Sequence, residues 1–132
     1  MTDRPSATAL MRERFVALAD AVAEVREQVG DPHSGAGGRS IRVSLYGGLT
    51  FEVLPERGLD IGSLWYAGSP IAWRSALPAA GPLAGPDGQG WIGSFTGGML
   101  ATCGLDNIGP ARDGYGLHGS HHSVRAVDVA VT

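Results

Sequence analysis

The first thirty residues carry an apolar stripe at helical spacing, with charged residues on the opposite face. Apolar positions recur at steps of three and four, at Met11, Phe15, Leu18, Val22, Val25 and Val29. Gly30 and Pro32 then supply stop signals, because glycine tolerates a left-handed cap and proline cannot continue a helix. The pattern predicts one N-terminal α-helix over Ala7–Val29, followed by a glycine-rich linker, and we assign residues 1–38 to this helix and linker.

Beyond the linker the apolar pattern changes to a period of two, which is typical of β-strands. Two such runs, 41–45 and 49–53, flank a Gly-Gly pair. A two-residue loop would put the apolar residues of the two strands on opposite faces of the hairpin. A three-residue loop ending at Gly48 instead pairs Val43 with Phe51 and gathers the apolar residues on one face. We therefore predict the three-residue loop, with Gly48 in a left-handed conformation.

The remaining strands are expected to be short. We predict them over Asp60–Tyr66, Pro70–Arg74, Met99–Leu105 and Tyr115–His118. The first two would form a second hairpin across the turn at 67–69, which is rich in turn-forming residues. With 21 glycines and 8 prolines in 132 residues, the composition suits many short strands joined by turns. The sequence therefore predicts a mostly β domain over residues 39–132.

Composition and charge exclude several classes of function. The chain has a net charge of −3, and its 10 basic residues are all arginines. This balance provides no cationic surface for nucleic acid. Without lysine there is no phosphate-binding loop of the Walker type, and no Schiff-base or Ser-x-x-Lys chemistry. The single cysteine, Cys103, excludes an internal disulfide and a cysteine-based zinc site.

Membrane and secretory signals are not recognisable in the sequence. The longest apolar stretch is too short to span a bilayer, and the chain does not open with a basic segment followed by an apolar one and a cleavage site. We therefore expect a protein without a membrane partner, located in the cytoplasm.

Three histidines within five positions, His118, His121 and His122, are the first candidates for chemistry. Histidine transfers protons near neutral pH, and its neutral imidazole is a common zinc ligand. In a strand, His118 and His122 would share one face while His121 points away, so a full ligand set would need carboxylates from elsewhere. Proton transfer or ligand binding by His118 is the favoured interpretation, and a metal site or a structural histidine are the alternatives.

The other candidates each have a structural alternative. Arg57 and Asp60 lie three residues apart beyond a predicted strand end. They could line a site carried by that loop, or form an ion pair that pins the turn. Three tryptophans lie farther along the chain, at Trp65, Trp73 and Trp91. They would pack in the core or stack on the apolar face of a sugar ring. Asn107 would cap a turn.

Five motifs, taken in their order along the chain, form a more specific pattern than any one of them does alone. They are VLPERGLDIG at 53–62, PIAW at 70–73, GW at 90–91, FTGGMLATCGL at 95–105 and YGLHG at 115–119. Taken together, they resemble the uncharacterised bacterial branch of the aldose 1-epimerase (galactose mutarotase-like) family. The likeness runs, with gaps, from about residue 39 to about residue 122.

The resemblance implies a fold, an activity and a set of site residues. The fold would be part of a β-supersandwich of antiparallel sheets, with a sugar bound in a cleft on one sheet. The activity would be interconversion of sugar anomers, an isomerase reaction that needs no cofactor and no metal, and His118 would be the catalytic residue. The implied substrate-binding residues are Arg57, Asp60, Trp73, Trp91, Asn107, His118 and His122. A non-catalytic carbohydrate-binding or assembly module is the alternative.

The sequence also departs from that family. Its members are longer, and no acidic residue stands after His122 where the family would place its base, Asp128 being the only carboxylate there. We therefore expect a truncated N-terminal portion of the sandwich, with one open sheet face. Either the N-terminal helix or a second copy in a homo-oligomer covers this face, or the chain is only marginally folded.

Overall fold

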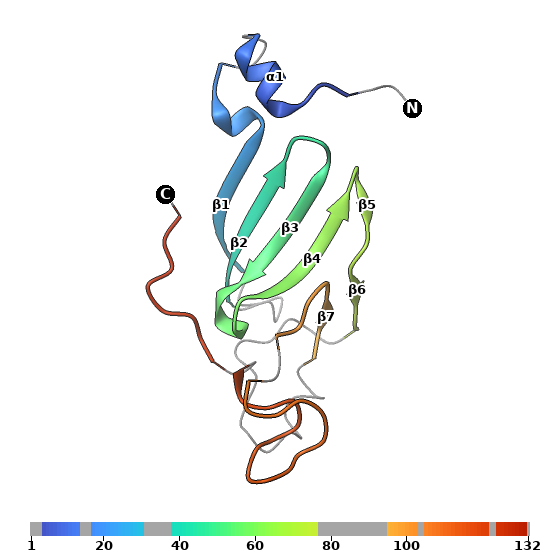
Figure 1. The fold of residues 1–132 in the computed structure, drawn as a ribbon, viewed down its shortest axis with the longest axis vertical. Coiled ribbons are helices and arrows are strands. Elements are labelled where there is room, and N and C mark those ends of the chain that lie inside the picture. Colours follow the sequence, from blue (N-terminus) through green and yellow to red (C-terminus); the bar gives the residue numbers. More distant parts are fainter. Residues whose placement is uncertain are drawn as a thin grey trace.

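The chain folds as a five-stranded antiparallel sheet with a small two-stranded sheet beside it and one short helix before it (Figure 1). This computed structural model describes residues 4–13, 17–30, 38–76, 95–102, 105–121 and 124–131. The prediction of a mostly β fold with antiparallel sheets, preceded by one N-terminal α-helix, is confirmed. In the part of the chain so described, no helix has the length and apolar character that crossing a bilayer requires.

The N-terminal helix is much shorter than predicted. Helix α1 spans Ala7–Arg12 and begins at Ser6, whose hydroxyl oxygen accepts a hydrogen bond from the Ala9 N–H at 3.1 Å. A 3₁₀ turn, η1, follows at Ala19–Ala21, and strand β1 occupies Ala23–Val29. The helix predicted over Ala7–Val29 is therefore wrong beyond α1.

The error has a physical cause. A spacing of four residues, as between Val25 and Val29, puts two side chains on one face of a helix but also on one face of a strand. Pairing with a neighbouring strand decides between the two, because β1 forms a complete antiparallel ladder with β2, Arg39–Leu45. Strand β1 of the sheet therefore lies within residues 1–38, the region predicted to contain only the helix and the linker.

The sheet is a simple meander in the order β1-β2-β3-β4-β5, with β3 at Leu49–Leu54 and β4 at Asp60–Tyr66. In the β2–β3 hairpin, Val43 pairs with Phe51, and the N–H of Gly48 donates to the carbonyl of Leu45 at 3.1 Å. Gly48 has a φ of +97°, which favours glycine. The three-residue loop predicted from the apolar pattern is confirmed.

The second hairpin differs from the prediction at its turn and in its second strand. Tyr66 pairs with Ser69, so the loop has two residues rather than three, and both have positive φ as hairpin turns of this length require. Strand β5 is only Ser69–Pro70. The predicted strand Pro70–Arg74 is wrong as a unit, because β6, Trp73–Arg74, leaves this sheet and pairs with β7, Gly97–Gly98.

The last two predicted strands are also wrong. In the described residues of the predicted strand Met99–Leu105, namely 99–102 and 105, the only pairing is an isolated bridge from Leu100 to Ile61, and Leu105 is 91% exposed. Over Tyr115–His118 the only ladder contact in the described chain is an isolated bridge from Tyr115. Asn107, which lies between these two segments, donates to the carbonyls of Pro110 and Gly116, and such side-chain bonds to backbone compete with strand ladders.

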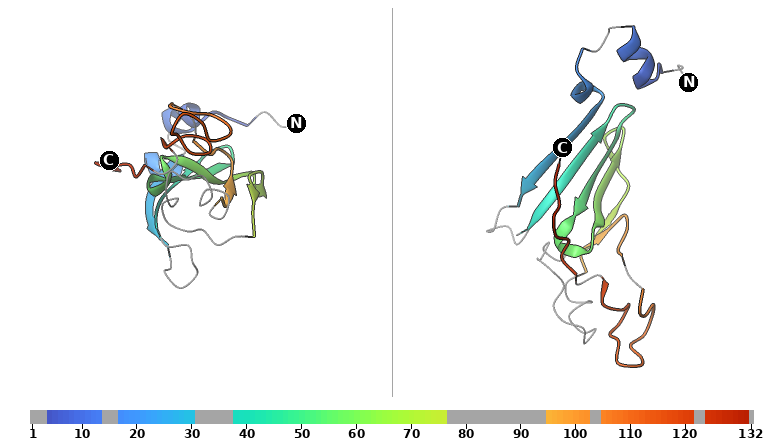
Figure 2. Two further views of the ribbon diagram at one scale, coloured as in Figure 1. Left: turned by 90° about the horizontal axis from the view of Figure 1, so that it is seen from below. Right: turned by 60° about the vertical axis from the view of Figure 1, so that its left-hand side comes forward.

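The two faces of the sheet differ in character. Val43, Phe51 and Leu64 stand opposite one another on three neighbouring strands of the apolar face, and all three are half-buried. Among the described residues, Val22 is the only buried member of the hydrophobic core. Helix α1 buries none of its residues and lies beyond the tip of the β2–β3 hairpin (Figures 1 and 2), so it does not cover the apolar face as expected.

Candidate functional site

A cleft of about 400 Å³ lies on the polar face of the five-stranded sheet. Seen from below, the sheet is curved (Figure 2, left), and the cleft is bounded by the ends of β1 to β4 and by the β6–β7 pair. Its volume falls in the range of about 300–1,000 Å³ that is usual for small-molecule sites. Its charged and polar lining residues are Gln28, Arg39, Ser40, Glu52, Glu56, Arg57, Ser63, Arg74 and Thr96.

Arg57 reaches the cleft because of the turn that follows β3. The 3₁₀ turn η3, Pro55–Arg57, ends at Gly58, whose φ of +61° is left-handed. A side chain there would also place its Cβ 2.8 Å from the carbonyl oxygen of His121, so this position requires glycine. The reversal starts β4 at Asp60 and brings its carboxylate beside the Arg57 guanidinium.

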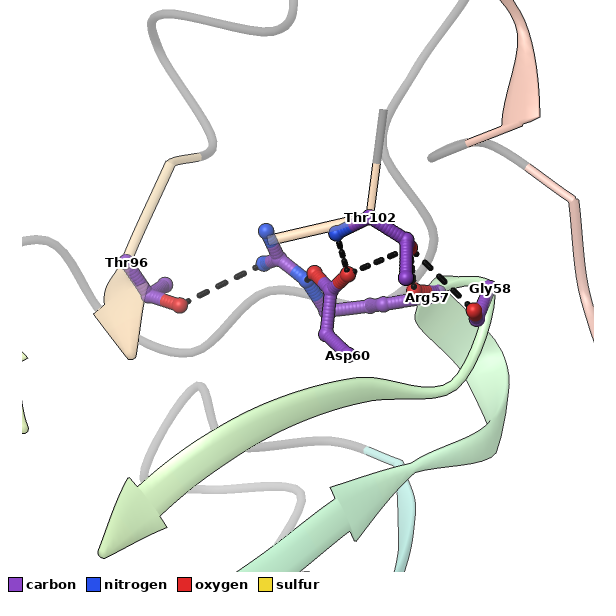
Figure 3. Close-up of polar contacts among 5 residues, drawn as sticks. All are labelled: Arg57, Gly58, Asp60, Thr96 and Thr102. Atoms are coloured by element: carbon purple, nitrogen blue, oxygen red, sulfur yellow. Dashed lines mark hydrogen bonds and ion pairs between the residues drawn. The ribbon is translucent and has the colours of Figure 1, made fainter. Parts of the chain in front are cut away.

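Arg57 and Asp60 form a buried ion pair (Figure 3). Arg57 Nε and Asp60 Oδ2 are 3.4 Å apart, and the two side chains are 5% and 4% exposed. Arg57 Nη1 also donates to the hydroxyl oxygen of Thr96 at 3.4 Å. Because buried charges require partners, this pair fixes both side chains in place.

Asp60 extends the network to a segment far along the sequence (Figure 3). Its Oδ1 accepts from the N–H of Thr102 at 2.5 Å and from the Thr102 hydroxyl at 2.6 Å. The same segment hydrogen-bonds to β4, where the N–H of Met99 donates to the carbonyl of Ile61 at 2.8 Å. We call Arg57, Asp60, Thr96 and Thr102 the clamp, because Thr96 is tied to Arg57 of η3 and Thr102 to Asp60 of β4. Thr96 and β7 form one wall of the cleft.

A second polar cluster organises the loop 105–121, away from the cleft. Asn107 is 4% exposed, and its side-chain N–H₂ donates to the carbonyls of Pro110 at 3.0 Å and Gly116 at 2.9 Å. Its side-chain oxygen accepts from Arg112 Nε at 3.2 Å. Asn107 thus holds the loop in shape, as the capping interpretation expects, and it does not line the cleft.

His118 belongs to the same loop. Its N–H donates to the carbonyl of Gly109 at 2.8 Å, and its Nδ1 accepts from the Gly109 N–H at 3.3 Å. The residue is half-buried, has a φ of +62°, and does not line the cleft. Among the described residues, no three His, Cys, Asp or Glu side chains are grouped to hold a metal.

Asp106 is the ionisable group of this loop whose pKa is perturbed. The Ser120 hydroxyl donates to its carboxylate, as do the Ser120 N–H at 3.1 Å and the Asn107 N–H at 2.8 Å. These hydrogen bonds, led by that of the Ser120 hydroxyl, lower the pKa of Asp106 because they favour the charged form.

Three further residues were predicted to bind substrate, and the structure describes one of them, Trp73. Trp73 is 62% exposed and stacks on Phe95, with ring centroids 6.0 Å apart and planes at 28°. It lies on β6 but does not line the cleft. Trp91 and His122 lie outside the residues that the structure describes. Of the predicted site residues that the structure describes, Arg57 and Asp60 are brought together, and Arg57 alone lines the cleft.

Most of the charged and polar cleft residues, among them Glu52 and Arg74, were not among the predicted site residues. Glu52 and Arg74 lie on strands, and strand residues with alternating burial were interpreted only as structure. The signal was present, because the period-two pattern that puts Val53 on the apolar face puts Glu52 on the opposite, polar face. Arg74 had no such signal, since its place depends on the pairing of β6 with β7.

Comparison with known proteins identifies the family but no function. The chain belongs to the family described as a domain of unknown function (DUF4432), whose model matches residues 35–132. No curated protein and no solved structure matches the chain significantly.

Asp60→Asn is expected to lower the free energy of unfolding by about 3 kcal/mol, because it removes the carboxylate charge that pairs with the buried Arg57 guanidinium. Glu24→Gln is the matched control. It breaks the exposed Glu24–Arg26 ion pair, with side chains 39% and 70% exposed, and should cost less than about 0.5 kcal/mol.

Urea denaturation followed by circular dichroism measures both variants. If Asp60→Asn does not fold, Thr102→Val provides the readout, with an expected loss of about 1–2 kcal/mol for the missing hydroxyl donor. Equal stabilities of Asp60→Asn and Glu24→Gln would show that the clamp does not stabilise the fold.

Ser120→Ala is expected to raise the pKa of Asp106 towards its ordinary value. The hydroxyl stabilises the carboxylate, so its contacts are present at neutral pH and are lost as the pH falls through the lowered pKa. Carboxyl ¹³C shifts of Asp106 over an acid titration measure the change. Ser6→Ala, at the start of α1, is the control and should leave the titration unchanged, and a Ser120→Ala curve that overlays the wild type would refute the assignment.

Proposed function

We propose that this chain is a carbohydrate-binding protein of the aldose 1-epimerase type, with the cleft on the polar sheet face as its sugar site. The cleft is the observation that carries the proposal, because it combines a small-molecule volume with many hydrogen-bonding side chains on an open sheet. The ordered motifs add the resemblance to the galactose mutarotase-like family. A cytoplasmic location belongs to the same proposal.

The lining suits a polyhydroxylated ligand. Sugar hydroxyls both donate and accept hydrogen bonds, and the cleft offers arginine donors, glutamate acceptors and the hydroxyls of Ser40, Ser63 and Thr96. Arg57 is held by Asp60 and Thr96, so its orientation is set before a ligand arrives. Such preorganisation reduces the entropy lost on binding.

Anomer interconversion would need a base at the anomeric hydroxyl and an acid at the ring oxygen. Two carboxylates line the cleft, and Glu56 is already ion-paired with Arg125, which leaves Glu52 as the candidate base. The resemblance implies His118 as the catalytic residue, but His118 does not line the cleft, so the cleft offers the candidate base and not this histidine. The proposed reaction needs no cofactor and no metal.

A non-catalytic carbohydrate-binding or assembly module is the second candidate. One observation favours it: no histidine among the described residues lines the cleft. The half-buried apolar face of the sheet supports a further expectation, that a second copy of the chain covers it in a homo-oligomer.

Saturation-transfer NMR with galactose and glucose tests the binding proposal on the full chain. We expect saturable binding in the millimolar range, weakened about five-fold or more by Glu52→Gln, because a charged acceptor is replaced by a neutral one. Glu24→Gln, whose carboxylate lies outside the cleft lining, is the matched control and should bind as the wild type does. Failure of every sugar to saturate the signal would reject the sugar site.

Exchange spectroscopy between the α and β anomers separates the two candidates. Acceleration of anomer exchange that is lost in His118→Ala would support the epimerase. Binding without acceleration would favour the non-catalytic module. Equal acceleration by wild type and His118→Ala would exclude a catalytic role for His118.

A further inference from the structure

Not all of the charges that line the cleft have an ion-pair partner among the described residues. Five charged residues contribute to the lining, namely Arg39, Glu52, Glu56, Arg57 and Arg74. Three of them have partners of opposite charge. Arg39 Nε lies 3.4 Å from Glu27 Oε1, Arg57 Nε lies 3.4 Å from Asp60 Oδ2, and Glu56 pairs with Arg125. The other two, Arg74 and Glu52, form no ion pair within the described chain.

Arg74 is anchored at the edge of the cleft, and no described carboxylate forms an ion pair with it. Its Nη1 donates to the hydroxyl oxygen of Ser63, a β4 residue that is 3% exposed. Ser63 lines the cleft as well, so this bond directs the guanidinium towards the hollow. An arginine carries five N–H donors in a planar fork, and one bond to a serine leaves most of them available.

Glu52 is the opposite charge on the cleft floor. Its cross-strand neighbour is Arg42, yet the Arg42 guanidinium lies over the ring of Trp65, 5.5 Å from the ring centroid, and forms no ion pair with Glu52 in the described structure. The Glu52 carboxylate, which is acceptor-only when ionised, is therefore available to hydroxyl donors of a ligand.

We propose that the cleft binds an acidic monosaccharide, a uronate, with the carboxylate of the ligand on Arg74 and its hydroxyls on Glu52. This inference rests on the proposed sugar site and narrows its ligand class. The planar guanidinium matches a carboxylate through two parallel hydrogen bonds. A sugar acid supplies a carboxylate for Arg74 and hydroxyl donors for Glu52 in one molecule, whereas a neutral sugar supplies only the hydroxyl donors.

Isothermal titration of the full chain with galacturonate, galactose and galactosamine at low ionic strength tests the proposal. We expect galacturonate to bind about ten-fold more tightly than galactose, with galactosamine the weakest, and the preference to shrink as salt is added. In Arg74→Gln the affinity for galacturonate should fall to that for galactose, while galactose changes less than two-fold. Arg12→Gln, on α1 far from the cleft, is the matched control and should leave all affinities unchanged.

The outcomes separate this inference from the function on which it rests. If galactose and galacturonate bind equally, or if Arg74→Gln keeps the preference, the acidic ligand is wrong and the sugar site stands. If no sugar binds, both fail. If galactosamine binds most tightly, Glu52 rather than Arg74 sets the charge preference and the inference is overturned. Circular dichroism of Arg74→Gln confirms that a lost preference is not a lost fold.

Discussion

The geometry of the site depends on neutralising one buried charge pair. Arg57 and Asp60 are almost fully buried, so each must keep its partner and its hydrogen bonds. Asp60 meets this requirement through Thr102, 42 residues away in the sequence. Strand β7 has only two residues, too few to hold a sheet by itself. The hydrogen bonds that the buried Asp60 carboxylate accepts from Thr102 therefore help to position the 96–102 segment, which lines one side of the cleft.

The structure has two polar clusters, one at the clamp and the cleft and one in the loop 105–121, and their side chains are arranged differently. In the clamp and the cleft, the side chains Arg57, Arg74 and Glu52 are directed towards a shared hollow. In the loop 105–121, by contrast, Asn107 satisfies its hydrogen bonds within the loop itself. The side chain of Asn107 is used within the loop, whereas Arg74 and Glu52 line the cleft and form no ion pair within the described chain. This contrast is why the proposed function is assigned to the cleft.

The sequence predicted the parts of this arrangement that depend on local pattern. The period-two alternation was enough to predict the β2–β3 register, because one shift would have turned every apolar side chain to the other face. The ion pair of Arg57 and Asp60 was among the alternatives considered, since their spacing permits it. The strand at Ala23–Val29 was missed because helix and strand periods coincide there and only pairing with β2 decides. Arg74 was missed because its place comes from β6–β7 pairing across a long separation in sequence.

Mapping a bound sugar by amide chemical shifts tests most directly whether the cleft or the loop is the site. A ¹⁵N-labelled chain titrated with galacturonate should show its largest shifts at cleft amides, those of Glu52, Ser63 and Gly97, with Asn107 and His118 little affected. Shifts concentrated in the loop 105–121, with the cleft amides unmoved, would contradict the account.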